Sequence, residues 1–253
     1  MRDIKDKKER NALEREQGRR IRDNAENVWG WATPAGAFRV NRRVNEILKK
    51  IGDSNGVKIL ELGCGTGIFT EQLAMRNINI TALDISVDLL GSAKEKQRVN
   101  KILAADAEFL PFKDESFDFV VGVSILHHLD IGRSLREIKR VLKPGGKLIL
   151  SEPNMANPQI FLQKNIGWLK KLTGDTPSET AFFRGRTKCN LQKNGFRGVS
   201  ILPFEFLHPF TPVFLIDIIR RVEYFLEKLP IIKEITGSLL IYAEKEEVTR
   251  CPR

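Results

Sequence analysis

The architecture of this chain is organised around the segment Lys58-Ile59-Leu60-Glu61-Leu62-Gly63-Cys64-Gly65-Thr66-Gly67-Ile68-Phe69-Thr70. Its apolar residues before Gly63 predict a buried strand, and the apolar spacing that resumes after Gly67 predicts a helix. Glycines at alternate positions between them predict a tight turn, because glycine adopts positive φ freely and lets a ligand approach the backbone. The first N–H groups of the helix face the turn, so the segment suits a nucleotide-like ligand.

Strands and helices alternate along the rest of the chain. Apolar runs predict seven strands: Ile59–Leu62, Ile78–Leu83, Ile102–Ala105, Phe117–Val123, Lys147–Leu150, Gly198–Leu202 and Ser238–Ala243. Such alternation predicts an α/β protein, a doubly wound and mostly parallel sheet with helices on both faces. Ligands of such sheets lie beyond the carboxyl ends of the strands.

Polar residues stand where these strands end. Glu61, Asp84, Asp106 and Ser124 each fall at or just after a predicted strand end. Asp84 comes at the distance from the glycine turn where a doubly wound fold places the acid that accepts hydrogen bonds from a ribose. The alternative for each acid is a surface carboxylate or a helix cap.

Composition sets broad limits. The chain has 253 residues, 42% of them hydrophobic, with a formal net charge of +10. This charge is spread along the chain, so it favours a nucleic-acid or membrane partner only weakly. Three scattered cysteines indicate neither a disulfide framework nor a zinc site, and no apolar run reads as a signal peptide or a membrane span, so we expect a cytoplasmic protein.

Five ordered motifs together resemble the class I, seven-stranded S-adenosylmethionine-dependent methyltransferases, and within them the small-molecule and quinone-biosynthesis enzymes. The motifs are Glu61-Leu62-Gly63-Cys64-Gly65-Thr66-Gly67, Leu83-Asp84-Ile85-Ser86, Ala105-Asp106-Ala107-Glu108-Phe109-Leu110-Pro111-Phe112, Phe117-Asp118-Phe119-Val120 with Leu126-His127-His128-Leu129, and Leu142-Lys143-Pro144-Gly145-Gly146. The resemblance implies a three-layer fold whose last strand is antiparallel. A dinucleotide fingerprint is disfavoured because residue 68, where it needs Gly or Ala, is Ile.

The resemblance implies one domain over residues 1–253. Residues 1–39 are expected to form a helical arm and cap, and residues 40–153 the cofactor-binding core. Residues 154–253 are expected to supply helical insertions after the fifth and sixth strands, on the substrate side, and the closing strands. Within the first insertion, Thr176-Pro177-Ser178-Glu179 has capping-box spacing and predicts the start of a helix.

The resemblance also implies the cofactor contacts. The residues expected to touch the methionine part and the ribose are Glu61, Gly63, Cys64, Gly65 and Ser124. Asp84 is expected to accept both ribose hydroxyls, with Ile85 against the adenine. Asp106 is expected to accept the adenine amino group, with Ala107 supplying a backbone N–H. S-adenosylhomocysteine is then the product.

Methyl transfer needs alignment and exclusion of water, and a base only for some acceptors. His127, beyond the fourth strand, is the first candidate for that base, although a histidine that caps the strand fits the sequence equally well. Trp29, Trp31 and His208 are candidates for substrate contact, with simple packing as the alternative for the tryptophans. The histidine spacing indicates no metal site.

The apolar and aromatic insertions favour a small-molecule or lipid-like acceptor, methylated on oxygen or carbon. One alternative is an RNA methyltransferase, which only the basic charge supports. The other is a non-catalytic S-adenosylmethionine-binding protein. The apolar stripe over residues 214–229 is expected to face the core, and the alternative is a lid or a peripheral membrane contact.

Overall fold

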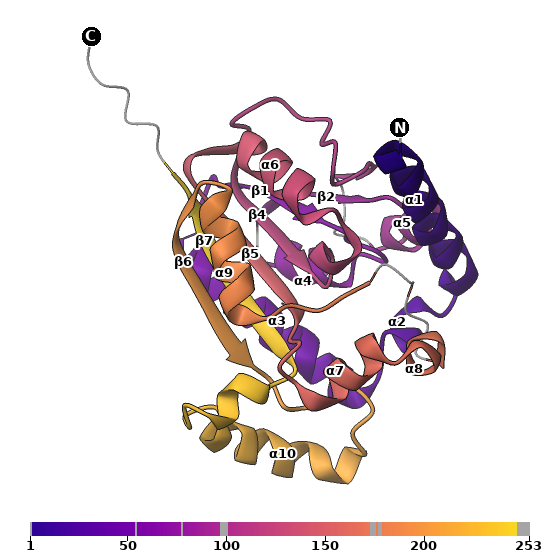
Figure 1. Ribbon diagram of the computed structural model, residues 1–253, viewed down its shortest axis with the longest axis vertical. Helices are drawn as coiled ribbons and strands as arrows, with labels where there is room; N and C mark the ends of the chain where they lie inside the picture. The colour runs from indigo at the N-terminus through magenta and orange to yellow at the C-terminus, as the bar shows by residue number, and fades with distance from the viewer. Residues whose placement is uncertain are drawn as a thin grey trace.

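A seven-stranded sheet lies at the centre of the protein. The computed structural model describes residues 2–53, 55–76, 78–96, 101–172, 176 and 179–246 (Figure 1). The strands are β1 (Lys58–Leu62), β2 (Asn79–Asp84), β3 (Ile102–Ala104), β4 (Phe117–Val123), β5 (Leu142–Pro153), β6 (Phe196–Phe204) and β7 (Ser238–Lys245). Their order is β3-β2-β1-β4-β5-β7-β6, and only β7 runs antiparallel to its neighbours. The predicted fold class is confirmed.

The helices cover both faces of this sheet. Their bounds are α1 (Arg2–Ile21), α2 (Ala25–Val28), α3 (Pro34–Ile51), α4 (Ile68–Ala74), α5 (Val87–Lys94), α6 (Ile131–Val141), α7 (Pro158–Asn165), α8 (Gly167–Leu172), α9 (Arg184–Lys193) and α10 (Val213–Leu226), with short 3₁₀ turns at Leu126–His128 and Ile232–Ile235. The helices α7 and α8 follow β5 and α10 follows β6, so helical insertions occupy both expected places.

Alternate residues of the central strands pack on opposite faces. In β4, Val120 packs with α6 and α9 on one face, while Phe119 and Val121 pack with α3 and α4 on the other. This two-sided burial explains why β4 is almost wholly apolar. It fixes the register of the strands, and therefore the positions of the polar residues that follow them.

The helix predicted to begin at Thr176 is not formed. Residues 179–183 are not helical, and α9 begins at Arg184. The backbone N–H of Thr176 does donate to the Glu179 carboxylate at 2.7 Å, which is half of a capping box. The motif therefore closes a local loop, and Pro177 and Ser178 lie outside the described residues.

The prediction that the apolar stripe of α10 faces the core is wrong. Phe214 is 76% exposed and Phe225 is 65% exposed, whereas Ile216 and Glu223 are buried. The helix meets the body of the protein through a narrow contact with α3, in which Arg42 pairs with Glu223 at 2.8 Å. Figure 1 shows α10 at the edge of the molecule, away from the sheet.

The N-terminal arm is the helix α1, which lies beside α5 (Figure 1). A Cβ at Gly18 would lie 2.2 Å from the Ser86 hydroxyl, so the contact requires glycine in α1. The sparse apolar residues of the arm did not indicate this close packing. It brings the polar face of α1 to the edge of the sheet where the strands end.

Candidate functional site

One cavity of about 820 Å³ opens along the carboxyl ends of the strands. Its lining includes nearly every residue singled out from the sequence: Trp29, Trp31, Gly63, Cys64, Gly65, Asp84, Ile85, Asp106, Ala107, Ser124, His127 and His208. Glu61 is not part of the lining and lies buried in β1. The cavity is large enough for a ligand of nucleoside size together with a second molecule.

The glycine turn forms the floor of the cavity at β1. Gly63, Gly65 and Gly67 all have positive φ, between 53° and 76°. A Cβ at Gly65 would lie 3.1 Å from the Trp29 ring, and the Cys64 N–H donates to the Leu83 carbonyl in β2 at 2.9 Å. The turn therefore presents bare backbone to the cavity, and Trp29 lies against this turn.

Asp84 organises the turn from β2. Its carboxylate accepts the N–H of Gly65 and the N–H of Ser86, each at 2.8 Å. Burial raises the pKa of Asp84 above its ordinary value, and the two N–H groups act in the opposite direction. A carboxylate has about four lone-pair sites, so both oxygens can still accept a hydroxyl each.

Glu61 supports the turn from below. Its Oε2 atom is buried and has no hydrogen-bond partner among the described residues. Burial raises the pKa of Glu61 to about 7, against the effect of the nearby Thr70 hydroxyl. A buried carboxyl without a partner on one oxygen is a site where a donor from a ligand or a water would bind favourably.

Asp106 is in contact with the arm. Lys7 of α1 pairs with its carboxylate at 2.8 Å, and the Asn11 side-chain amide donates to it at 2.9 Å. Despite burial, which acts the other way, Lys7 and the neighbouring donors lower the pKa of Asp106. An adenine amino group would share this carboxylate with α1, so the predicted role of Asp106 stays a prediction.

Ser124 follows β4 with a φ of 54°, an uncommon conformation for a residue with a side chain. Its N–H donates to the Ser151 carbonyl at 2.8 Å. The backbone N–H is therefore engaged within the sheet. Contact with the methionine end of a cofactor would then come from the hydroxyl or the backbone carbonyl of Ser124.

His127 is held by a carboxylate that the sequence did not single out. Its Nδ1 lies 2.8 Å from Glu152 Oε2 at the end of β5, and Glu152 Oε1 accepts the N–H groups of Ile125 and Leu126. Burial raises the pKa of Glu152 to about 7, against those N–H groups. Burial, followed by the charges of His128 and Lys164, lowers the pKa of His127 well below its ordinary value.

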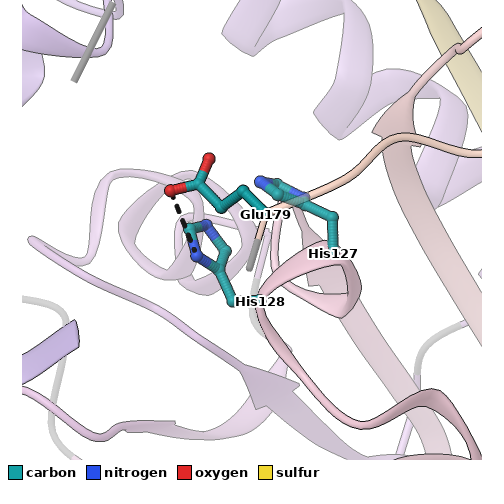
Figure 2. Close-up of side chains that lie close together, drawn as sticks. All are labelled: His127, His128 and Glu179. Carbon is teal, nitrogen blue, oxygen red and sulfur yellow. Dashed lines mark ion pairs between the residues drawn. The ribbon is translucent and has the colours of Figure 1, made fainter. Parts of the chain in front are cut away.

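His128 belongs to a second polar network, shown in Figure 2 beside His127. Its Nδ1 lies 3.1 Å from Glu14 of α1 and 3.7 Å from Glu179. Burial lowers the pKa of His128, but Glu14 and Glu179 outweigh it and raise that pKa above its ordinary value. The network ties the arm and the first insertion to the end of β4.

His127, His128 and Glu179 offer ligand atoms within 4.8 Å of one another, which is the geometry of a loose metal site. Glu179 is also bound by the Lys164 ammonium group at 2.9 Å. A cation in this position competes with a divalent ion for the carboxylate. We therefore interpret the three residues as members of two neighbouring polar networks, His127 with Glu152 and His128 with Glu14 and Glu179.

The other end of the cavity is lined by two arginines from α3, of which Arg43 is buried and Arg39 is partly buried. The Arg43 guanidinium donates to Glu205, Ser151 and Ser238, and Arg39 Nε donates to Glu205 Oε2 at 2.9 Å. Trp31 lies 5.0 Å from both guanidinium groups and packs edge-on against Phe69. Trp31 is thus largely a core residue that supports this wall.

His208 lies at the same end. Its Nε2 is 3.0 Å from the Gln159 side-chain nitrogen of α7. Burial and the charge of Arg39 lower the pKa of His208 below its ordinary value. His208 therefore lines the cavity, and its contact with a substrate stays a prediction. The sequence did not indicate that Arg39 would lie near it.

Comparison with known proteins decides the class of this site. Residues 60–150 match the family model described as a methyltransferase domain. These residues form a methyltransferase domain, in agreement with the resemblance to the class I, S-adenosylmethionine-dependent methyltransferases.

Curated relatives match this domain. The chain is 36% identical over 106 residues to the malonyl-[acyl-carrier protein] O-methyltransferase of Erwinia pyrifoliae, which is 42% of this chain and 40% of that one. It is 35% identical over 124 residues to the demethylmenaquinone methyltransferase of Staphylococcus aureus, 46% of this chain and 52% of that one. The chain therefore spans about half the length of the curated relatives it matches.

The fold extends beyond the matched domain. A solved S-adenosylmethionine-dependent methyltransferase from Thermotoga maritima superposes with a TM-score of 0.65 at 22% identity, covering 89% of this chain and 98% of that one. At this identity the likeness shows the fold alone. The seven strands, with β7 antiparallel, agree with what the resemblance implied.

The cavity of the methyltransferase domain fits the cofactor of its class. The bare glycine backbone allows the close approach that a ribose needs, and the Asp84 carboxylate offers acceptors for its hydroxyls. Arg39, Glu152 and the polar residues of α1 were missed from the sequence. The partners of Arg39 and of the α1 residues are more than 90 residues away along the chain, and the partner of Glu152 follows a different strand. No local sequence pattern indicates such contacts.

Proposed function

We propose that the protein transfers the methyl group of S-adenosylmethionine to oxygen or carbon of a small-molecule or lipid-like acceptor. The observation that carries this proposal is the joint position of Asp84, the glycine turn and His127 on one cavity. When bound, the sulfonium supplies an electrophilic methyl group. The names of the two curated relatives, both methyltransferases of non-nucleic-acid acceptors, support the choice of acceptor class.

The residues of the chain would then orient the reactants and move one proton. Asp84 would accept the ribose hydroxyls and the turn would hold the methionine part over β1. Ser124 and His127 follow β4, the next strand of the sheet, so an acceptor hydroxyl or acidic carbon would lie over β4. His127 Nε2 would take its proton while Nδ1–H donates to Glu152.

The test of this proposal is transfer of label from methyl-labelled S-adenosylmethionine into a cell extract divided into small-molecule, lipid, RNA and protein fractions. We expect label in the small-molecule or lipid fraction, and none when the protein is omitted. Label in the RNA fraction alone would favour the RNA alternative. Cofactor binding without label in any fraction would favour a non-catalytic protein.

Glu152→Gln tests the role of His127. Protonated Glu152 would donate to Nδ1 and force the ring proton onto Nε2, so we expect the wild-type rate to fall as the pH drops through about 7. A glutamine amide can donate to Nδ1 at every pH. The rate of the variant should therefore be about 100-fold lower than that of the wild type, with KM nearly unchanged. Its rate should also no longer fall as the pH drops through about 7. An unaltered pH profile in the variant would show that Glu152 does not set the state of His127.

The exposed apolar face of α10 favours a lipid-like member of the acceptor class. Phe206, Leu207 and Phe210, on the segment that leads into α10, line the cavity, so an acceptor could pass from a membrane surface to the site. No helix within the described residues is both long and apolar enough to cross a membrane.

Flotation with anionic vesicles tests this second candidate. Wild-type protein should float with the vesicles, and Phe214→Ser/Phe225→Ser should remain at the bottom while keeping its circular dichroism spectrum. Equal flotation of the wild type and the double variant would refute membrane contact through α10. Failure of both proteins to float would refute it as well.

A further inference from the structure

The cavity has carboxylates at one end and two arginines, with Glu205 between them, at the other. Asp84 and Asp106 line it at the ends of β2 and β3, where the cofactor is proposed to lie. Arg39, Arg43 and His208 line it near β5, β6 and β7. Three inter-strand spacings separate β2 from β5, which is roughly 14 Å.

The basic half contains donors without acceptors. Arg39 uses Nε for Glu205, and its two Nη groups make no hydrogen bond with any described residue. Only 14% of the Arg39 side chain is exposed, and the residue lines the cavity. A guanidinium with both Nη groups free presents a planar fork that matches a carboxylate or a phosphate.

The charges of this wall do not balance. Arg39 and Arg43 are both paired with the single carboxylate of Glu205. Burial, with the charge of Arg39 as a further cause against the pull of Glu205, lowers the pKa of Arg43 to about 10. A second anion on the cavity side would relieve the repulsion between the two guanidinium groups.

The backbone of Glu205 has an uncommon conformation. Its φ of 74° lies in the left-handed region, which is costly for glutamate. Its N–H donates to Glu227 at 2.6 Å and its carbonyl accepts the Gly237 N–H at 2.8 Å. The strained backbone keeps the carboxylate beneath both arginines, so that the guanidinium of Arg39 stays at the cavity wall.

We propose that the methyl acceptor carries an anionic group, a carboxylate or a phosphate monoester, that the two Nη groups of Arg39 bind. This proposal rests on the proposed function, because it names the class of its acceptor. It makes Arg39 a specificity residue, with Arg43 and Glu205 holding it in place.

The position of Arg39 favours the acceptor over the carboxylate of the cofactor as the bound anion. The network of Arg39, Arg43 and Glu205 is anchored on Ser151 of β5 and Ser238 of β7. Arg39 is close enough to His208, on the segment after β6, to lower its pKa. These elements lie on the side of β4 away from the glycine turn and Asp84.

The test is an NMR and calorimetric titration of protein saturated with S-adenosylhomocysteine. The probes are benzoate and phenyl phosphate, with methyl benzoate as the uncharged counterpart. We expect at least one anion to bind about tenfold or more tighter than methyl benzoate. The ratio between the two anions distinguishes a carboxylate acceptor from a phosphate.

Arg39→Gln should abolish this preference and Arg39→Lys should retain part of it, while both bind S-adenosylhomocysteine as the wild type does. Arg76→Gln, at an exposed arginine outside the cavity lining, is the matched control and should keep the preference. No anion preference in the wild type, or the same preference in Arg39→Gln, would overturn the proposal. So would a loss of S-adenosylhomocysteine affinity in Arg39→Gln without a loss for methylthioadenosine, because Arg39 would then bind the cofactor carboxylate.

Repeating the titration without S-adenosylhomocysteine separates this inference from the proposed function. Anion selectivity in a protein that does not bind S-adenosylhomocysteine would refute methyl transfer, and the bound anion would then not be a methyl acceptor. Cofactor binding without anion selectivity would refute the anion site alone.

Discussion

Asp84→Ala is expected to weaken S-adenosylhomocysteine binding by at least about 100-fold, measured by isothermal titration calorimetry. The substitution removes the proposed ribose acceptor, and hydrogen bonds to a charged group contribute about 1.5 to 3 kcal/mol each. It also removes the acceptor for the N–H groups of Gly65 and Ser86, so the glycine turn loses its support. Both losses weaken the binding of S-adenosylhomocysteine.

Asp84→Asn separates the two effects. The amide keeps one oxygen for a backbone N–H but has no charge and a single acceptor, so its affinity should lie between those of the wild type and of Asp84→Ala. Circular dichroism should show that all three proteins are folded. Unchanged affinity in Asp84→Ala would refute the assignment of the ribose site.

Glu205→Ala is expected to lower the free energy of unfolding by about 3 to 5 kcal/mol, the range for removing one partner of a buried ion pair. The buried guanidinium of Arg43 and the partly buried guanidinium of Arg39 would lose their shared carboxylate. Although burial acts in the other direction, these arginines lower the pKa of Glu205, which indicates that the carboxylate is ionised in the folded protein. Urea unfolding of the full chain measures the loss.

Glu205→Gly is the matched comparison. It removes the same carboxylate, but glycine adopts the φ of 74° without the cost that alanine has. The glycine variant should therefore be more stable than the alanine variant by about 1 kcal/mol. A loss below about 1 kcal/mol in both variants would show that the arginines do not depend on Glu205.

The core of the fold was predictable because its signals are local. The strand before Gly63, the glycine turn and Asp84 follow one another along the chain, and each has its own pattern of apolar spacing or residue type. The predicted cofactor residues from Gly63 to Ser124 accordingly line one cavity, with Glu61 below it. Parallel strands bring their carboxyl ends to one edge, which the alternation of strands and helices already implies.

The errors arose where tertiary context outweighs the local pattern. The stripe of α10 has the period of a core helix, yet the helix is held by an ion pair at Glu223 and leaves Phe214 exposed. Thr176 and Glu179 make a capping contact without a helix. Glu152 and Arg39 reach the site from β5 and α3, and no pattern in the sequence around either residue indicates this position.

The central claim is that the cofactor occupies the β1–β3 half of one cavity and leaves the half over β4–β7 to the acceptor. A crystal structure of the complex with S-adenosylhomocysteine tests it most directly. The account predicts ribose hydroxyls on the Asp84 carboxylate, the methionine part against Gly63 and Gly65, and no cofactor atom on the Nη groups of Arg39. A ribose away from Asp84, or a cofactor carboxylate on Arg39, would contradict it.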